Sequence, residues 1–353
     1  MKKRIIALLL AMVMVFALCA CGNGNNGSNA GSEDVGDETY TIRIACENSD
    51  SYPSTLGLYQ MEKYIESHTN GKVQVEVCAS GQLGGEEETL EQVAQGNLEM
   101  AVASFAPVVS YVPEFEVMDI PFVYNSYAEA WMVLDSYVGT NLLDKMEAQG
   151  LKGLAYMENG MRQVTSNVSA INSIDDFKGI KLRTMQNNNH IESFSALGAN
   201  PTPVAFSELY ISLSQKVVDA QENPIANVTD KKLYEVQKYL SLTNHIYDAM
   251  PLVCNLDFFN SLPQAYQKVV QAGAIYAQEF SRFCNMEREE LILADLADKY
   301  GMQVNEVSSE ARAEMAKAAQ PAVMELVAKD IGQDAVDQYM QDVQDVLAQI
   351  SKY

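Results

Sequence analysis

The stretch YTIRIACENSDSYPSTLGLYQMEKYIESHTNGKVQVEVC, residues 40–78, carries the pattern that decides the fold. Apolar and other residues alternate in YTIRIAC (40–46), as in a strand with one buried face. Apolar residues then recur at helical spacing after Pro53, and KVQVEVC (72–78) alternates again. The order strand, helix, strand is typical of a parallel sheet in an α/β protein.

The pattern continues along the chain in two runs. The first adds a helix at 85–96, a strand at 98–104, a helix at 127–148 and a strand at 151–157. The second starts near Met161 and consists of predicted strands at 161–166, 180–184 and 202–204 and helices at 190–198 and 207–215. Each run is long enough for a domain of its own.

A helical pattern then spans residues 263–299. At about 1.5 Å per residue this helix would be about 55 Å long and would reach both domains. Two helices that break near Gly273 are the alternative. Amphipathic helices are predicted in the C-terminal tail.

These patterns predict an α/β fold with two α/β domains, a ligand cleft between them and a long bracing helix. Domain I would comprise residues 39–160 plus about 246–285, and domain II residues 161–245 plus about 286–353. Open parallel sheets bind ligands at the carboxyl ends of their strands. The residues that follow each strand are therefore the candidates for the site.

The N-terminus has the pattern of an export signal. Three basic residues, Lys2 to Arg4, precede an apolar run from Ile5 to Leu18 that is too short for a membrane span. The following LCACG resembles the lipobox of bacterial lipoproteins, with Cys21 as the lipid-bearing residue. Residues 1–20 would be the signal peptide and residues 21–38 a flexible tether that holds the protein at the outer face of the cell membrane. An ordinary secretory signal is the alternative.

Charge and composition argue against several kinds of partner. The formal net charge is -23, and no basic cluster follows the signal, so nucleic acid is not expected. The scattered histidines and the lack of a Cys-x-x-Cys pair predict neither a metal site nor a cofactor. The sequence leaves open whether the remaining cysteines form disulfides or buried thiols: Cys46, Cys78, Cys254 and Cys284.

Several polar residues follow predicted strands. The strand in GIKLRTM (179–185) ends on Arg183. This arginine would either form a structural ion pair with Asp175 or Asp176 or bind the carboxylate of a ligand. In AQENP (220–224), Glu222 and Asn223 lie either at the cleft or at the start of a helix. The same two roles are open to Glu47 and Asn48 after the first strand and to Ser104 after the third.

Longer motifs resemble a known family. GMRQVTSN (160–167), DDFKGIKLRTM (175–185) and ALGANPTPVAFSELYISLSQKVVDAQENP (196–224) resemble the solute-binding proteins of tripartite ATP-independent periplasmic (TRAP) transporters. LYEVQKYLSLTNH (233–245), GQLGGEEETLEQVAQGNLEMA (81–101) and DIPFVY (119–124) extend the resemblance. It implies two domains that close over a ligand.

The resemblance also implies roles for single residues. Arg183 would pair with the ligand carboxylate, while Asn223, Arg162 and Phe206 would make further contacts. Arginine suits this role because its planar guanidinium donates two parallel hydrogen bonds to one carboxylate. Gln186 lies in a polar stretch that suits ligand hydroxyls or, alternatively, an exposed helix start.

The expected function is therefore that of a lipid-anchored extracytoplasmic receptor. It would capture a sugar acid or a C4-dicarboxylate and deliver it to the membrane subunits of a TRAP transporter. The resemblance implies that members that bind sialic acid carry an acid at the position of Ser104 and an arginine near Pro107. Neither is present here, so sialic acid is not expected. A sensor-coupled receptor remains an alternative. An enzyme is not expected, although Glu47 and Glu222 would form a carboxylate pair if they faced each other.

Overall fold

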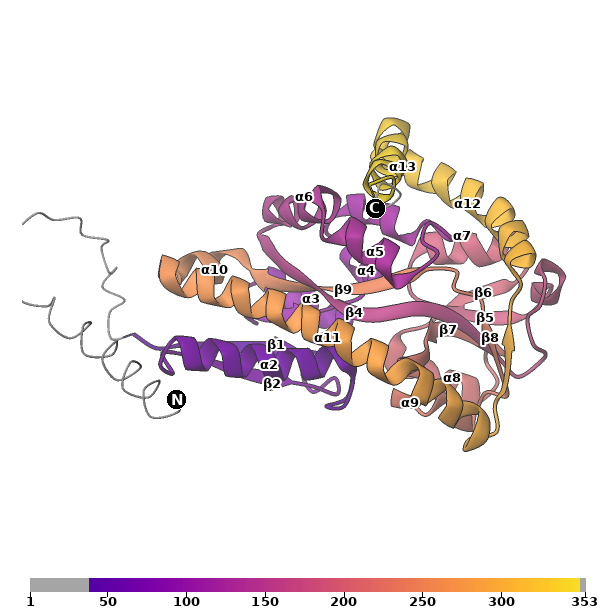
Figure 1. The fold of residues 1–353 in the computed structure, drawn as a ribbon, viewed down its shortest axis with the longest axis horizontal. Coiled ribbons are helices and arrows are strands. Elements are labelled where there is room, and N and C mark those ends of the chain that lie inside the picture. The colour runs from indigo at the N-terminus through magenta and orange to yellow at the C-terminus, as the bar shows by residue number, and fades with distance from the viewer. Residues whose placement is uncertain (1–37, 350–353) are drawn as a thin grey trace, which may run out of the picture. The chain divides into compact units, whose positions relative to one another are not determined.

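The computed structural model describes residues 38–349, and the predicted signal peptide and Cys21 lie outside this range. Ten strands form one sheet in the order β2-β1-β3-β9-β4-β7-β5-β6, with β8 beside β4 and β10 beside β8 (Figure 1). The strands are β1 (Tyr40–Ala45), β2 (Val73–Cys78), β3 (Met100–Val102), β4 (Leu151–Ser166), β5 (Lys181–Thr184), β6 (Asn200–Pro203), β7 (Ala220–Pro224), β8 (Tyr239–Leu242), β9 (Tyr247–Asn255) and β10 (Gln303–Glu306).

Helices cover both runs of strands. They are α2 (Pro53–His68), α3 (Glu86–Ala94), α4 (Phe105–Val108), α5 (Tyr127–Leu134), α6 (Tyr137–Lys145), α7 (Asn188–Ala196), α8 (Leu209–Ser214), α9 (Ile225–Asp230), α10 (Leu256–Ser261), α11 (Gln264–Asp298), α12 (Ser309–Ile331) and α13 (Gln333–Leu347). The 3₁₀ helix η1 (Pro113–Asp119) lies between α4 and α5. The fold is thus α/β, as the sequence predicts.

The sheet is mixed, which corrects the expectation of two parallel sheets. β1 is parallel to β2 and β3, and β5 is parallel to β6 and β7. β9 is antiparallel to β3 and β4, and β4 is antiparallel to β7. The cause is that β9 returns to the sheet between β3 and β4, far from its neighbours in sequence.

One strand joins the two runs. The sequence predicts separate strands at 151–157 and 161–166, whereas β4 continues through both. Its register shifts between Glu158 and Gly160, and Gly160 has a φ of 127°, which glycine adopts without strain. We name two parts of the sheet accordingly. The first half contains β2, β1, β3, β9 and residues 151–161, and the second half contains residues 162–166 with β5 to β8 and β10.

The C-terminal helices are buried in the cores of both halves of the sheet, whereas the sequence predicts residues 286–353 to belong to domain II. Met315 and Ala319, in the first part of α12, are buried in the core of the second half. Val323 and Val327, four and eight residues after Ala319, are buried in the core of the first half, together with Tyr339 of α13. A helix of 23 residues is about 35 Å long, so α12 reaches from one core to the other.

The long helix is unbroken and crosses both halves of the sheet. α11 has 35 residues and continues through Gly273, which excludes the predicted alternative of two helices. It packs against α2 and β4 and ends beside α9 (Figure 1). A Cβ atom on Gly57 of α2 would lie 2.5 Å from the carbonyl oxygen of Ala277. Glycine at this position therefore sets how closely the two helices approach.

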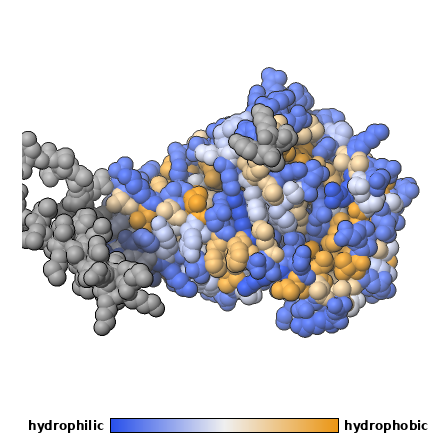
Figure 2. Space-filling view, in the orientation of Figure 1, coloured by the Kyte–Doolittle hydropathy of each residue, from blue (hydrophilic) through white to orange (hydrophobic). Residues whose placement is uncertain are grey.

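The surface in Figure 2 is mostly hydrophilic, with apolar side chains gathered toward the C-terminal end of α11, which carries the exposed residues Met286 and Leu291. Within residues 38–349, none of the helices combines the length and apolarity that crossing a bilayer requires. Cys46, Cys78, Cys254 and Cys284 are buried free thiols. Cys46 directly follows β1 and Cys78 is the last residue of the neighbouring strand β2. The two do not form a disulfide.

The close approach of α2 and α11 can be tested with Gly57→Ala. Alanine favours a helix by up to about 1 kcal/mol over glycine. We nevertheless expect the substitution to lower the free energy of unfolding by about 1 kcal/mol or more, because overpacking costs about 1–3 kcal/mol. Urea unfolding measures the change. The control is Ser67→Ala on the exposed face of α2, and a stabilised Gly57→Ala variant would contradict this packing.

Candidate functional site

The site centres on Arg183, the third residue of β5. Its side chain is 1% exposed, and Nε donates a hydrogen bond to the carbonyl oxygen of Val204 at 2.8 Å. Nη1 is buried and has no partner, and Arg183 makes no ion pair with any residue in the described range. Asp175 pairs with Lys178, and Asp176 accepts hydrogen bonds from Ser173, so neither is the counter-ion.

Arg183 faces a cavity of about 250 Å³ between the two halves of the sheet. The opposite wall carries Glu47, which follows β1, and Glu86, the first residue of α3. Glu87 and Glu88 of α3 line the same wall. The rest of the lining consists of Gly85, Ala106, Pro107, Met185, Gln186, Ala205, Phe206 and Ser207. The arrangement places a cation from the second half opposite four carboxyl groups from the first.

A smaller cavity of about 20 Å³ shares Arg183, Glu86 and Phe206 with the first. It is also lined by residues that the sequence singled out, Asn48, Ser104 and Asn223, and by Asn159, Asn227 and Met250. Amide groups therefore extend the site beyond the guanidinium. They offer both donors and acceptors to a bound molecule.

Burial dominates the electrostatics of these groups. Loss of water lowers the pKa of Arg183 to about 10, so the guanidinium is still charged at neutral pH. Burial and the charge of Glu47 raise the pKa of Glu86 to about 8. Burial also raises the pKa of Glu47, although the nearby Lys231 opposes this shift. At neutral pH the acidic wall thus holds a proton that isolated carboxyl groups would have lost.

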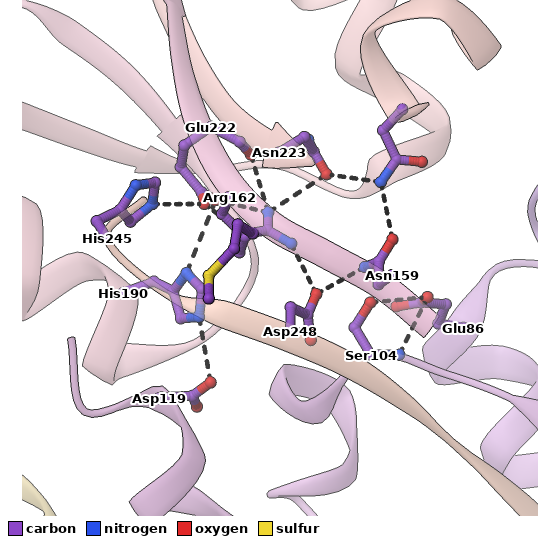
Figure 3. A network of polar contacts seen from close by, with 12 residues as sticks. Glu86, Ser104, Asp119, Asn159, Arg162, His190, Glu222, Asn223, His245 and Asp248 are labelled. Atoms are coloured by element: carbon purple, nitrogen blue, oxygen red, sulfur yellow. Dashed lines mark hydrogen bonds and ion pairs between the residues drawn. The ribbon is translucent and has the colours of Figure 1, made fainter. Parts of the chain in front are cut away.

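Arg162 has a different environment from Arg183. Nε and Nη2 donate to the carboxylate of Glu222, and Nη1 lies 2.8 Å from Oδ2 of Asp248 (Figure 3). All three side chains are buried, and neither Arg162 nor Glu222 lines the two cavities. The structure therefore places these predicted site residues behind the site. It also separates Glu222 from Glu47, so the two do not form a facing carboxylate pair.

Two histidines complete this buried network. Nε2 of His245 lies 3.1 Å from Glu222, and Nε2 of His190 lies 3.2 Å from Asp119 of η1 (Figure 3). Hydrogen bonds and charges of Asp119 and Glu222 outweigh burial and raise the pKa of His190 to about 9. Arg162 and the histidines hold the pKa of Glu222 well below its usual range.

Asn223 connects the network to the site. Its Nδ2 donates to Gln221 at 2.6 Å, and its Oδ1 accepts from Arg162 and Asn227 at 3.3 Å each. Asn227 in turn bonds to Asn48 at 3.0 Å. A chain of hydrogen bonds thus leads from the buried Arg162 to the first half of the sheet.

Other bonds join the two halves beside the cavity. Nζ of Lys231 donates to the carbonyl oxygen of Glu47 at 3.2 Å and lies 4.6 Å from the ring centroid of Phe206. Ser49 donates a hydrogen bond to Asp230. The contacts between the halves beside the cavity are therefore polar, whereas the core within each half is apolar.

Sequence reasoning missed several residues that line the cavities: Glu86, Glu87, Glu88, Met185, Asn159, Asn227 and Met250. The helix dipole by itself accounts for three acids at the start of α3, so their pattern shows no separate sign of a binding role. Among the three, Oε1 of Glu86 turns inward and accepts hydrogen bonds from Ser104. Its place at the start of the helix that follows β2 was the available signal.

Larger hollows lie elsewhere. One of about 620 Å³ is lined by Tyr52, Asp230, Arg288 and Leu291, between α2, α9 and α11. Arg288 there is half-buried and donates to the carbonyl oxygen of Ser51. A buried charge that forms no ion pair with the described residues lies instead at the 250 Å³ cavity beside Arg183, which is therefore the candidate site.

Comparison with known proteins identifies the family. The model of "Bacterial extracellular solute-binding protein, family 7" matches residues 44–330. The chain belongs to this family, the solute-binding proteins of TRAP transporters. A solute-binding protein of Verminephrobacter eiseniae is 34% identical over 298 residues, which is 84% of this chain and 88% of the relative.

Solved structures agree with this assignment. The sugar acid binding protein DctPAm from Advenella mimigardefordensis, in complex with galactonate, is 33% identical with a TM-score of 0.83, and the match covers 88% of this chain and 99% of that one. A TRAP solute-binding protein from Sulfurospirillum deleyianum with bound succinate is 32% identical with a TM-score of 0.80 and coverages of 86% and 98%. These relatives are binding proteins and not enzymes, so this family 7 protein is extracytoplasmic and non-enzymatic.

The charge on His190 makes stability depend on pH. Its pKa of about 9 lies above the unfolded value of about 6.5, so its contribution is complete below pH 6.5 and is lost as the pH rises through 9. We expect the stability difference between wild type and His190→Gln to shrink by about 3 kcal/mol over this interval. Urea unfolding at a series of pH values measures it.

The control is Thr140→Ala, which removes a hydroxyl that does not ionise from an exposed position of α6. The difference between wild type and this control should be nearly the same at every pH. A difference for His190→Gln that grows with pH would contradict a charged His190 between Asp119 and Glu222.

Proposed function

We propose that this family 7 protein captures a small organic carboxylate through Arg183 and delivers it to the membrane subunits of a TRAP transporter. The observation that carries the proposal is the buried guanidinium of Arg183, which faces a cavity and forms no ion pair with any of residues 38–349. Burying such a charge without a partner costs several kcal/mol. A ligand carboxylate would offset this cost.

The surrounding residues suit such a ligand. Asn223, Asn48 and Ser104 offer polar groups, while Phe206 and Gln186 form part of the wall of the larger cavity. We infer that Arg162 and Glu222 act indirectly, because they hold Asn223 and its strand in place instead of contacting the ligand.

Relatives support the ligand class. DctPAm was solved with galactonate and the Sulfurospirillum deleyianum protein with succinate. Both compounds are small carboxylates, one a sugar acid and the other a C4-dicarboxylate. We therefore propose a sugar acid or a C4-dicarboxylate as the ligand of this chain.

We further propose that the two halves of the sheet are domains that separate to admit the ligand, with the boundary near residue 160. The halves are joined beside the cavity by few polar contacts, such as Asn48 with Asn227 and Glu47 with Lys231. Polar contacts of this kind exchange readily with water, whereas apolar cores do not. The closed form would be the one that the membrane subunits recognise.

Substitution of Arg183 tests the proposal. We expect Arg183→Met to abolish measurable binding and Arg183→Lys to weaken it about tenfold or more, because lysine cannot make both parallel hydrogen bonds. Arg183→Met should also unfold at the same or a higher temperature, since it removes an uncompensated buried charge. Calorimetric titration with carboxylic acids and their primary amides measures binding, and thermal denaturation measures stability.

The control is Arg43→Lys in β1, where the partly exposed arginine pairs with Glu99 at 2.8 Å. It should bind like wild type. Equal affinity of wild type for an acid and its amide would rule out recognition of the carboxylate by Arg183.

Cys21 is proposed as the lipid attachment site, in keeping with the lipobox-like LCACG of residues 18–22. We expect Cys21→Ser to release the protein from the membrane fraction of its native host or a lipoprotein-processing host. Cys19→Ser, two residues earlier, should leave it attached. Fractionation and the intact mass of the mature protein give the answer, and identical behaviour of the two variants would exclude a lipid on Cys21.

A further inference from the structure

We propose that the acidic wall of Glu47 and Glu86 makes the site selective for polyhydroxy monocarboxylates and against dicarboxylates. The inference rests on the proposed function, because it takes Arg183 as the point where a ligand carboxylate binds. It narrows the ligand class that the relatives leave open.

The two walls of the cavity present complementary unpaired groups. Nη1 of Arg183 is a buried donor without an acceptor, and Oε1 of Glu47 is a buried acceptor without a donor. Both residues line the same cavity. Buried polar groups are nearly always hydrogen-bonded in proteins, so the pair indicates a ligand with an anionic end and a donor further along the molecule.

The carboxyl groups of the wall are fixed in place. Oε2 of Glu47 accepts from the backbone nitrogen of Glu86 at 3.2 Å. Oε1 of Glu86 accepts from the backbone nitrogen and the hydroxyl of Ser104 at 3.2 and 3.0 Å. Because these groups are held by the backbone, they cannot easily turn away from a ligand.

A second carboxylate on the ligand would meet this wall. Like charges in a buried site repel strongly, and a second carboxylate would lie among the carboxyl groups of Glu47, Glu87 and Glu88, which line the same cavity. Glu86, whose pKa burial and Glu47 raise to about 8, would be kept from ionising beside it. The nearby base is Lys231, whose charge acts on Glu47 and whose Nζ is bonded to the carbonyl oxygen of Glu47. Among the residues lining the larger cavity, Arg183 is the single base.

A hydroxyl fits the wall better than an ammonium group. Lys231 already offsets the charge of Glu47, and Glu86 is mostly protonated at pH 7. A neutral donor therefore satisfies Glu47, and a hydroxyl can also accept a hydrogen bond from protonated Glu86. An added ammonium would instead bring a third cation close to Arg183 and Lys231.

The size of the cavity agrees with a short acid. At about 30 Å³ per water molecule, 250 Å³ corresponds to about eight waters. This is the scale of a short-chain acid and not of an oligosaccharide. The apolar side chains of Met185 and Phe206 can cover its carbon backbone.

Two series of matched compounds test the selectivity by calorimetric titration at pH 7. The four-carbon series is erythronate, succinate, butyrate and 4-aminobutyrate, and the six-carbon series is gulonate, adipate, hexanoate and 6-aminohexanoate. Each compound has a carboxylate for Arg183. The dicarboxylate, the plain acid and the amino acid of a series differ at the far end, whereas the hydroxy acid also carries hydroxyls along the chain. We expect the hydroxy acid of at least one series to bind about tenfold or more tightly than its three partners.

Variants test whether the carboxyl groups of Glu47 and Glu86 cause the preference for the hydroxy acid. In Glu47→Gln/Glu86→Gln, the preference for the hydroxy acid over the dicarboxylate should fall about tenfold or more, because the two carboxyl groups held beside the cavity by backbone and Ser104 hydrogen bonds are replaced by neutral amides while Glu87 and Glu88 stay. Glu91→Gln, at an exposed position of α3 bonded to Gln95, should keep the wild-type preference. Thermal denaturation confirms that each variant is folded.

The results separate this inference from the proposed function. If acids bind better than their amides but the dicarboxylate or the amino acid binds as tightly as the hydroxy acid, the selectivity inference is wrong and the function of Arg183 stands. An unchanged preference in the double variant also overturns the inference. If the amides bind as well as the acids, or if no compound binds, both proposals fail.

Discussion

The site depends on a difference between two buried arginines: one is held in ion pairs with protein carboxylates, and the other is not. Arg162 and Arg183 are both 1% exposed, but within the described residues Glu222 and Asp248 form ion pairs with Arg162 and not with Arg183. Without these carboxylates, two neighbouring guanidinium groups would repel each other in a medium that screens charge poorly. Because the first is neutralised, the second can remain charged and open toward the cavity. The buried ion pairs are therefore a condition for the site, even where they contribute little to stability.

The same region shows how a rigid scaffold can carry a site that opens. β4, α11 and α12 each contact both halves of the sheet, and α12 buries apolar side chains in the cores of both. The contacts beside the cavity are polar and few. A motion that separates the halves would therefore break hydrogen bonds that water can replace, while the apolar cores stay packed. Gly160, at the register shift in β4, lies where the strand passes from one half to the other.

Much of the fold follows from local patterns. The strands at 40–45 and 73–78, the helix that starts at Pro53 and the unbroken α11 all lie where periodicity predicts them. The predicted break between 157 and 161 is absent, because β4 bends at Gly160 instead of ending. The placement of α13 on the first half was also missed, since an amphipathic pattern shows that a helix has an apolar face but not which core that face covers.

Local sequence patterns placed Arg183 near the carboxyl end of a strand, at the mouth of the sheet. They placed Asn48 and Ser104 after strands and Asn223 in a turn; the structure has Asn223 within β7 and brings all three to one cavity. Only the tertiary structure decided which arginine is compensated, that Glu222 lies behind the site, and that Glu86 faces Arg183. The physical reason is that strand ends are set by local backbone preferences, whereas the partner of a buried charge depends on side chains that are distant in sequence.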